Sequence, residues 1–504
     1  MSINAEKRNK VLKALREGKT PEGFEVQGWG EEFPLLDHQL SGVLWAILTP
    51  KGLLADSVGV GKTGTALGLL QWLRATGKLS PKDRAIIIVP AISIYGSWEK
   101  DGIQKFVPDL PYAIGRGTKA QRMRIYQDPT WSVLLTNYET MRNDVDILQG
   151  MGFKYVILDE ADAVRNHTTK TAKAVKRLTK RAKRVLAMTA TPVQNHLMDL
   201  HGIMEAVGLN SVFGTAAQFR KEYEKSQLKK VFYNGSWHWQ RVVIGYKNTG
   251  KLKTKLVPFY LRRTYKDISV AMPEIKSQTK YLEMNKEQRR LYREVQSGFA
   301  SLTPDSPPME IRSAALRLRQ ICTTTALLSD RTDSACKFDW IVSQMKGDWQ
   351  EEKVVIFSNW KVSIAALCAR LKEEGIGYVI MTGDVSQEER EDLRQQFWDD
   401  PDTKILIGTT AIEKSLNLQC ARVQVNMDML WNASRHKQLA GRVQRIGSIH
   451  DDVYVFTLVV EDSIEQAVLK ILQEKQALAD HMFDEESKIF EKLSTEDLLK
   501  LIRS

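Results

Sequence analysis

A short apolar run followed by a glycine-containing loop constrains the fold of this chain more than any other feature. Gly52-Leu53-Leu54-Ala55 has the character of a buried strand, and Asp56-Ser57-Val58-Gly59-Val60-Gly61-Lys62-Thr63 follows it directly. Such a loop, set between a strand and a helix, directs backbone N–H groups and a helix N-terminus at phosphate oxygens. The pattern therefore predicts a strand–loop–helix unit within a parallel α/β sheet, with phosphate bound at the turn.

The residues of this loop have separate expected roles. Lys62 would neutralise β- and γ-phosphate oxygens, and Thr63 would place its hydroxyl on Mg²⁺. The strict pattern has Gly where this chain has Asp56, so a glycine-rich turn without a ligand is the alternative interpretation. The residues expected to contact the nucleotide are Gly59, Val60, Gly61, Lys62, Thr63 and Gly64.

Two series of short apolar runs place the chain in the α/β class. The first series comprises 52–55, 85–89, 132–135, 155–158 and 184–188, and the second comprises 353–357, 378–381, 404–407, 423–426 and 453–456. Helix-length stretches separate the runs, which is typical of parallel sheets that are buried on both faces. We therefore predict two α/β domains, of which only the first carries a phosphate loop.

Composition indicates a folded, basic protein. The 504 residues include 73 Lys and Arg against 61 Asp and Glu, a formal charge of +12. This excess favours a polyanion such as nucleic acid, and a basic protein without such a partner is the alternative. The four cysteines form no C-x-x-C pair, and no secretory leader or membrane-spanning run is visible. We therefore expect an intracellular, cytoplasmic protein without membrane contact.

Two carboxylates end one run of the first series. Asp159 and Glu160 follow Tyr155-Val156-Ile157-Leu158. At a strand tip, one carboxylate can enter the Mg²⁺ shell and the next can orient an attacking water, and we assign these roles to Asp159 and Glu160 respectively. A helix N-cap is the alternative. The phosphate loop upstream favours the magnesium and water chemistry.

Two arginines near the C-terminal end have a matching pattern. Arg442 and Arg445 are spaced i, i+3, so one helix face would present both. The planar guanidinium suits the spread charge of a phosphoryl group during transfer. Surface salt bridges are the alternative for an isolated pair. Gln438 and Gly441 extend the pattern and favour a role at the γ-phosphate.

Together these motifs resemble those of superfamily-two helicases (the DEAD/DEAH-type ATPases) and, within them, the Swi/Snf-related DNA translocases. The similarity begins at 36–45, where Gln39 matches the family's adenine reader, and in the phosphate loop an Asp in place of the first Gly is normal for the family. It continues through Asp159-Glu160-Ala161-Asp162, Thr189-Ala190-Thr191-Pro192, Arg262-Arg263 and 438–447. Asp162 and Ala190 stand where the family more often has His and Gly. These departures affect the assignment to a subfamily and not the resemblance to the family.

The resemblance implies two RecA-like parallel-sheet domains with an ATP cleft between them, and with helical and hairpin insertions. It implies ATP and Mg²⁺ as cofactors, Gln39 and Gln438 as further nucleotide contacts, and duplex DNA as the track. The implied catalytic set is Lys62, Glu160, Arg442 and Arg445. The expected division is a basic helical extension at 1–34, a first lobe at 35–265 with an insertion near 210–255, a helical linker at 266–335, a second lobe at 336–468 and a helical tail at 469–504.

Basic and hydroxyl-bearing residues are the candidates for nucleic-acid contact. A helix over 169–184 would carry several Lys and Arg, with a solvated charged face as the alternative. Polar residues at strand tips suit phosphate and sugar contacts, with turn formation as the alternative. The candidate contacts are Ser93, Asn137, Lys173, Arg177, Thr189, Asn359, Thr382 and Thr409.

The stretch 231–246 predicts a β-hairpin with an Asn234-Gly235 turn. Its aromatic residues, which include Trp237 and Trp239, could stack on bases or wedge a duplex. Ordinary cross-strand packing of these rings is the alternative.

We expect a monomeric ATP-dependent DNA translocase or helicase that serves branch migration, fork remodelling or protein displacement. The compact build would fit a phage or bacterial member. One alternative is an RNA helicase, suggested by the Asp-Glu-Ala-Asp string, against which Trp45, Arg262-Arg263 and Trp431-Asn432 argue. A second is a non-catalytic nucleic-acid-binding scaffold with a degenerate ATP site, against which the intact Lys62, Asp159 and Glu160 argue.

Overall fold

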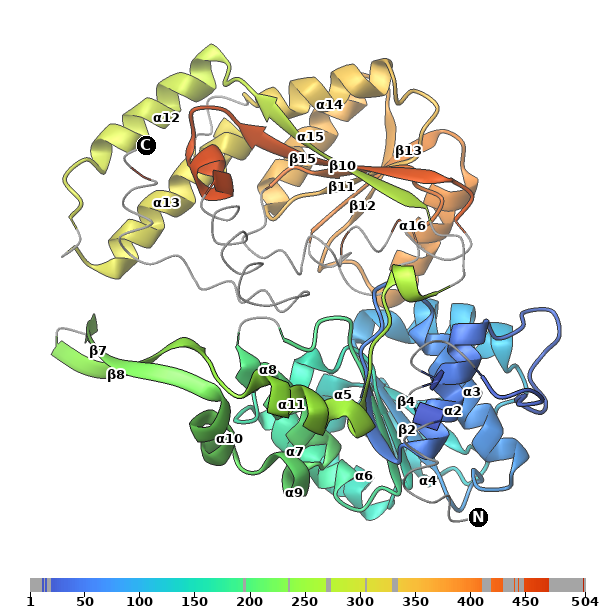
Figure 1. Ribbon diagram of the computed structural model, residues 1–504. Helices are drawn as coiled ribbons and strands as arrows, with labels where there is room; N and C mark the ends of the chain where they lie inside the picture. Colours follow the sequence, from blue (N-terminus) through green and yellow to red (C-terminus); the bar gives the residue numbers. More distant parts are fainter. Residues whose placement is uncertain are drawn as a thin grey trace. The chain divides into compact units, whose positions relative to one another are not determined.

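The computed structural model divides into two compact units, Met1–Val270 and Ala271–Ser504 (Figure 1). It describes residues 11–12, 14–15, 20–193, 196–233, 236–268, 273–303, 306–328, 334–409, 418–428, 439, 443, 448–470 and 502. Each unit is built around its own sheet. Within the described ranges, no helix is both long enough and apolar enough to cross a membrane.

The sheet of the first unit has seven strands, all parallel. Their order is β3 (Tyr112–Ile114), β4 (Val133–Asn137), β2 (Ala85–Val89), β5 (Tyr155–Leu158), β6 (Arg184–Met188), β1 (Lys51–Leu54) and β9 (Tyr260–Leu261). The five strands predicted from apolar runs are confirmed. The sequence analysis did not include β3 and β9, which are edge strands of only three and two residues.

Helices cover both faces of this sheet. Alternate side chains of one strand enter opposite cores: Ile86 and Ile88 pack on one face, and Ile87 and Val89 pack on the other. The helices are α2 (Asp37–Leu48), α3 (Lys62–Ala75), α4 (Lys119–Gln127), α5 (Tyr138–Asn143), α6 (Val145–Gly150), α7 (Lys170–Thr179), α8 (Leu197–Val207), α9 (Asn210–Phe213), α10 (Ala216–Tyr223) and α11 (Thr249–Leu256). The first unit is therefore a three-layer α/β/α domain.

Two segments of the first unit differ from their predicted form. The basic helix expected over 169–184 ends at Thr179, and Arg184 instead begins β6 and donates to the carbonyl oxygens of Ala46 and Ile47. Leu12 and Leu15, in the segment expected to be an extension, are buried in the core beside α2 and α3.

The predicted hairpin is present and longer than expected. Strands β7 (Glu224–Tyr233) and β8 (Ser236–Tyr246) form an antiparallel two-stranded sheet. Figure 1 shows this ribbon extending away from the helices of the first unit. The predicted turn residues, Asn234 and Gly235, lie outside the described residues.

The sheet of the second unit has six strands, again all parallel. Their order is β10 (Glu274–Leu282), β15 (Asp452–Val460), β14 (Val423–Asn426), β11 (Val354–Phe357), β13 (Thr403–Gly408) and β12 (Gly377–Met381). The five strands predicted from apolar runs are confirmed. Strand β10 lies in the stretch that we expected to be a helical linker. Its side chains are mostly exposed, so its sequence contains no apolar run that would predict a strand.

The second unit also contains helices α12 (Lys286–Gly298), α13 (Pro308–Thr323), α14 (Cys336–Lys346), α15 (Lys361–Glu373) and α16 (Gln387–Asp399). Thr323, at the end of α13, donates to Asp428 at 2.5 Å, and Ser358 donates to the same carboxylate at 2.8 Å. Lys337 of α14 forms a buried ion pair with Glu465 at 2.8 Å. These buried polar contacts join the helices to the strand ends of the second sheet.

We predict that Gly202→Ala destabilises the first unit although alanine is the better helix former. Gly202 lies inside α8, and a Cβ there would be 1.8 Å from the carbonyl oxygen of Arg165, which follows the acidic motif. Relieving that overlap would cost about 1–3 kcal/mol. The matched control is Gly250→Ala in α11, where nothing lies within 4 Å, and this change should stabilise by roughly 0.5–1 kcal/mol. Thermal unfolding of both variants checks the contrast, and equal shifts of the same sign would contradict it.

Candidate active site

The predicted phosphate and magnesium residues lie at one edge of the first sheet. In a parallel sheet all strands end at the same edge, where α/β proteins bind ligands. The phosphate loop follows β1, Asp159 and Glu160 follow β5, and β6 lies between these two strands. The tertiary structure thus brings together two motifs that are about one hundred residues apart in the chain.

The loop has the backbone form that a phosphate cradle requires. Gly59 and Gly61 have φ values of 82° and 81°, in the left-handed region that glycine adopts without strain. Successive N–H groups in such turns converge on an anion, and α3 begins directly afterwards at Lys62. A Cβ on Gly61 would lie 2.3 Å from Nε2 of Gln39, so a side chain there would disturb both residues.

Lys62 is held at the base of the loop. Its Nζ donates to the carbonyl oxygens of Asp56 and Ser57, at 2.8 and 2.9 Å. Both acceptors are neutral. A phosphate oxygen carries a negative charge and would make a stronger, charge-assisted hydrogen bond with the ammonium group.

Asp159 is half-buried and accepts a hydrogen bond from an aromatic neighbour. Trp98 donates from Nε1 to Oδ2 of Asp159 at 2.8 Å, and Tyr138 donates to the Asp159 carbonyl oxygen at 2.7 Å. Trp98 lies in a π-helix, Ile94–Gln104, a rare form found often at functional sites. Burial, together with the nearby charge of Glu160, raises the pKa of Asp159. A divalent cation at this carboxylate would favour its ionised form.

Glu160 has a backbone conformation that is costly for its residue type. Its φ of 46° and ψ of 56° lie in the left-handed region. A non-glycine residue held there typically stores about 1–3 kcal/mol of strain, and such residues cluster at active sites. The conformation turns the chain sharply after β5, before the short helix Ala161–Val164.

The start of α2 contacts the phosphate loop through two side chains. Gln39 accepts from the N–H of Leu36 at 3.0 Å and donates to the carbonyl oxygen of Gly61 at 3.1 Å. His38 lies 2.7 Å from the Val60 carbonyl oxygen through Nε2. Burial lowers the pKa of His38, so the neutral ring with a proton on Nε2 donates this bond. The predicted adenine reader is therefore beside the loop, and its amide is bonded to backbone groups.

Asp56, the departure from the general loop pattern, has a structural partner. Its carboxylate accepts from the backbone N–H of Arg263 at 2.9 Å and from Nε of the same residue at 3.2 Å, and both side chains are buried. The Arg263 guanidinium also donates to the His38 carbonyl oxygen and, at 2.7 Å, to Ser41. One guanidinium thus joins the loop, the start of α2 and the segment after β9.

The segment after β9 also pairs with the loop through its backbone. Ala55 donates to Leu261 at 2.6 Å, and Ser57 donates to Arg263 at 3.0 Å. Tyr265 donates its hydroxyl to the Val58 carbonyl oxygen. The first half of the phosphate loop is therefore fixed along the last strand of the first unit. Arg263 belongs to a motif that resembles the family, but its contact with Asp56 cannot be predicted from the sequence, because no local pattern links the two segments.

The side chains at this edge fit a magnesium-bound nucleotide. Thr63 lies in the first turn of α3, and Asp159 and Glu160 directly follow β5, so this edge has a hydroxyl and two carboxylates. Oxygen donors of this kind are the ligands that Mg²⁺ takes from proteins. The left-handed glycines and the N-terminus of α3 supply the complementary anion site.

The predicted nucleic-acid contacts of the first unit differ in accessibility. Ser93 and Thr189 are fully buried, and Asn137 caps α5 by accepting from Thr140 at 2.8 Å. Lys173 is exposed on α7, and Arg177 on the same helix pairs with Asp146 at 2.5 Å. Lys173 is therefore the most available of these side chains for a phosphate.

The predicted residues of the second unit share one edge of their sheet. Asn359, Thr382 and Thr409 follow β11, β12 and β13, which are neighbours in the sheet. All three are half-buried. The predicted nucleotide contacts Gln438, Arg442 and Arg445 lie outside the described residues.

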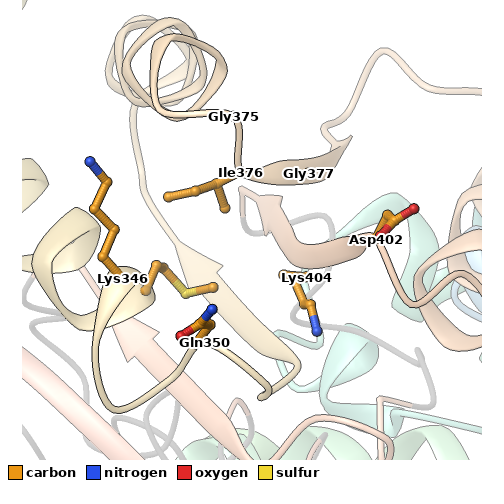
Figure 2. Close-up of a pocket in the computed structure, with 8 residues that line it drawn as sticks. Lys346, Gln350, Gly375, Ile376, Gly377, Asp402 and Lys404 are labelled. Atoms are coloured by element: carbon orange, nitrogen blue, oxygen red, sulfur yellow. The ribbon is translucent and has the colours of Figure 1, made fainter.

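A pocket in the second unit lies at the other edge of that sheet (Figure 2). Its volume is about 460 Å³, and its lining includes Gly377 and Lys404, near the starts of β12 and β13. Two of its lysines already have acidic partners, since Lys346 pairs with Glu374 and Lys404 lies 3.3 Å from Glu351. Because the pocket lies at the strand starts, it is separate from the carboxyl ends of the strands, where α/β sheets bind ligands.

We predict that Asp56→Gly destabilises the first unit, although it restores the general phosphate-loop pattern. The change leaves the buried Arg263 guanidinium without its carboxylate, and losing one partner of a buried pair costs about 3–5 kcal/mol. Thermal unfolding should show a clear loss of stability. As a control, Asp146→Ala removes the exposed partner of Arg177 and should change stability by less than about 1 kcal/mol. Wild-type stability of Asp56→Gly would contradict this role for Asp56.

Comparisons with known proteins agree with the motifs. The SNF2-related domain family matches residues 38–327, and the helicase conserved C-terminal domain matches residues 336–447. An uncharacterized ATP-dependent helicase of Mycoplasma pneumoniae is 27% identical over 479 residues, covering 93% of this chain and 44% of that protein. The putative ATP-dependent helicase/translocase YwqA of Bacillus subtilis is 27% identical, covering 93% and 50%. The ATP-dependent DNA helicase DDM1 of Arabidopsis thaliana is also 27% identical, covering 93% and 65%.

The chain thus spans about half of the length of these curated relatives. Among solved structures, the SWI2/SNF2 ATPase core of Sulfolobus solfataricus in complex with dsDNA is 24% identical, with a TM-score of 0.43, covering 95% of this chain and 99% of that one. The SNF2-related match alone takes in more than half of the 504 residues. With the phosphate loop, the acidic motif and the buried Asp56–Arg263 pair in place, the chain belongs to the SNF2-related family of superfamily-two helicases.

Proposed function

We propose that this protein is a DNA-stimulated ATPase that moves along duplex DNA. The observation that carries the proposal is the joint placement of the phosphate loop and the Asp159–Glu160 pair at one edge of the first sheet, on either side of β6. Membership of the SNF2-related family supports ATP as the nucleotide. One similar protein is a DNA helicase by name, which supports DNA as the track.

Each residue of the site has a distinct part in the proposed reaction. The loop N–H groups and Lys62 hold the phosphates, and Thr63 and Asp159 hold Mg²⁺. Bound Mg²⁺ would neutralise charge on the phosphate oxygens. Glu160 orients the attacking water and accepts its proton. Gln39 hydrogen-bonds to the adenine base. Its side-chain amide also donates to the Gly61 carbonyl oxygen, so the adenine contact and the phosphate loop share one residue.

The second unit completes the proposed site. Arg442 and Arg445 supply positive charge to the γ-phosphate during transfer, with Gln438 nearby, and the two units close on the nucleotide. The sequence motif supports this part of the proposal. Alternate closing and opening, driven by hydrolysis, would move the protein along its track.

Contacts with the DNA backbone would hold the track. Lys173 on α7 supplies an exposed charge, and Asn359, Thr382 and Thr409 supply polar side chains at one edge of the second sheet. Phosphate contacts of this kind carry no sequence information, which suits a motor that must bind every position equally. Branch migration, fork remodelling and displacement of bound proteins are the tasks that such movement serves.

We predict that Glu160→Gln lowers DNA-stimulated ATPase turnover by about 10²–10⁴-fold, because the amide cannot accept the proton of the attacking water. Nucleotide binding should persist, since Lys62 and the loop remain. Turnover assays with duplex DNA and equilibrium binding of a fluorescent ATP analogue measure the two effects. Glu139→Gln, an exposed glutamate on α5 outside the site, is the control and should leave turnover unchanged. Wild-type turnover of Glu160→Gln would refute the assignment.

The choice of polynucleotide separates the proposal from its alternatives. Duplex DNA should stimulate ATP hydrolysis more than single-stranded RNA does. Stronger stimulation by RNA would favour an RNA helicase. If the protein binds nucleic acid but hydrolyses no ATP with any polynucleotide, and Lys62→Ala changes nothing, the scaffold alternative is correct.

A further inference from the structure

We propose that one face of the β7–β8 hairpin binds unpaired nucleotides, with Trp239 stacking on a base and Lys230 and Arg241 contacting phosphates. The inference rests on the proposed function only in taking nucleic acid as the track. It adds a binding surface that is separate from the nucleotide site, because the hairpin is inserted between α10 and α11.

The strand register places these residues on a single face. Lys230 pairs with Trp239 and Leu228 pairs with Arg241, and directly opposed residues in an antiparallel ribbon share a face. Lys230 lies with its Nζ 5.7 Å from the centroid of the Trp239 ring. Arg241 donates from Nε to Ser226 at 2.6 Å, which orients its guanidinium along the same face. A ring and two cations are thus presented together.

This face is open to solvent. The exposed fractions of Trp239 and Leu228 are 65% and 64%. Among the hairpin residues whose side chains the structure describes, only Glu224 is buried, and it lies at the base of the hairpin next to the core residue Tyr223. Clustered large apolar side chains on a surface are typical of a binding site. Cross-strand aromatic packing, the alternative considered for this hairpin, does not cover the Trp239 ring.

The charge of the insertion selects the kind of partner. From residue 225 to residue 255 the chain has eight basic residues and no Asp or Glu. These eight are Lys225, Lys229, Lys230, Arg241, Lys247, Lys251, Lys253 and Lys255. Such a density of positive charge is complementary to a polyanion. An aromatic ring between cations is the arrangement that proteins use to bind single strands, stacking on bases while neutralising phosphates.

The geometry favours unpaired nucleotides over intact duplex. Inside a duplex both faces of each base are covered by neighbouring bases, so an exposed ring can stack only at a single strand, a fork or an end. A duplex would still bind to the lysines, but it would not use Trp239. The hairpin therefore gives the protein a preference for forked or single-stranded DNA that its motor site does not require.

The test compares Trp239→Ala with wild type for binding to a fork, a single strand and a blunt duplex of equal length. Base stacking contributes ~1–3 kcal/mol per base, so binding to the fork and the single strand should weaken by roughly 5- to 150-fold. Binding to the blunt duplex should change little. Trp239→Phe, which keeps an aromatic plane, should retain most of the affinity. Lys230→Ala should lower the salt dependence of single-strand binding by about 0.7 in log–log slope.

Two control variants remove exposed side chains of similar kind. Ile244→Ala lies in the same hairpin, at the bulge and away from the paired basic face, and is 56% exposed in the native protein. Tyr281→Ala removes an exposed aromatic ring from β10 in the second unit. Both should bind all three DNAs as wild type does. Matching thermal unfolding curves would show that Trp239→Ala has not disturbed the fold.

The outcomes separate this proposal from the proposed function. Unchanged fork and single-strand binding by Trp239→Ala overturns it, and so does an equal loss on all three DNAs. If Trp239→Ala instead abolishes self-association seen by sedimentation, the face joins copies of this chain and the proposal is wrong. If duplex DNA still stimulates wild-type ATPase in those cases, the motor function stands. If no DNA binds or stimulates the wild type, both fail.

Discussion

The buried ion pair between Asp56 and Arg263 is the contact on which the geometry of the first unit depends. The Arg263 guanidinium bonds the loop carboxylate, the first turn of α2 and, through the adjoining backbone, the segment that leaves β9. A charge in a low-dielectric interior is tolerated only when its partners are all in place. The three segments must therefore adopt one mutual arrangement. That arrangement presents Gln39, the left-handed glycines and Lys62 along one side of the sheet.

A second constraint shapes the acidic end of the site. Asp159 is partly shielded from water and bonded by Trp98 and Tyr138, while Glu160 has a left-handed backbone conformation. Neither condition favours stability by itself, since burial penalises the carboxylate and the backbone stores strain. The packed helices around β5 supply the compensation. Two carboxylates next to each other in sequence are thereby given different surroundings, which suits the different roles proposed for them.

The β7–β8 hairpin has the opposite physical character. The phosphate loop is fixed by the buried, hydrogen-bonded Asp56–Arg263 pair, whereas the hairpin is a two-stranded ribbon with an exposed Trp239 ring and four Lys or Arg residues against one Glu. Such a ribbon has little core of its own. A rigid edge suits chemistry that needs fixed distances. An exposed basic ribbon suits contact with a long polyanion whose bases come in any order.

The sequence by itself determined the α/β class, ten of the strands, the hairpin and the motifs, because each depends on local patterning: short apolar runs, turn residues and motifs that follow strands. Only the tertiary structure decided which distant residues meet. Asp56 bonds to Arg263, which is 207 residues away in the sequence, and Trp98 bonds to Asp159, which is 61 residues away. It also showed that Ser93 and Thr189 are buried, that the basic helix ends at Thr179, and that the polar β10 pairs with β15. A local sequence pattern indicates which secondary structure a segment favours, whereas its burial and its long-range pairing depend on which other segments pack against it.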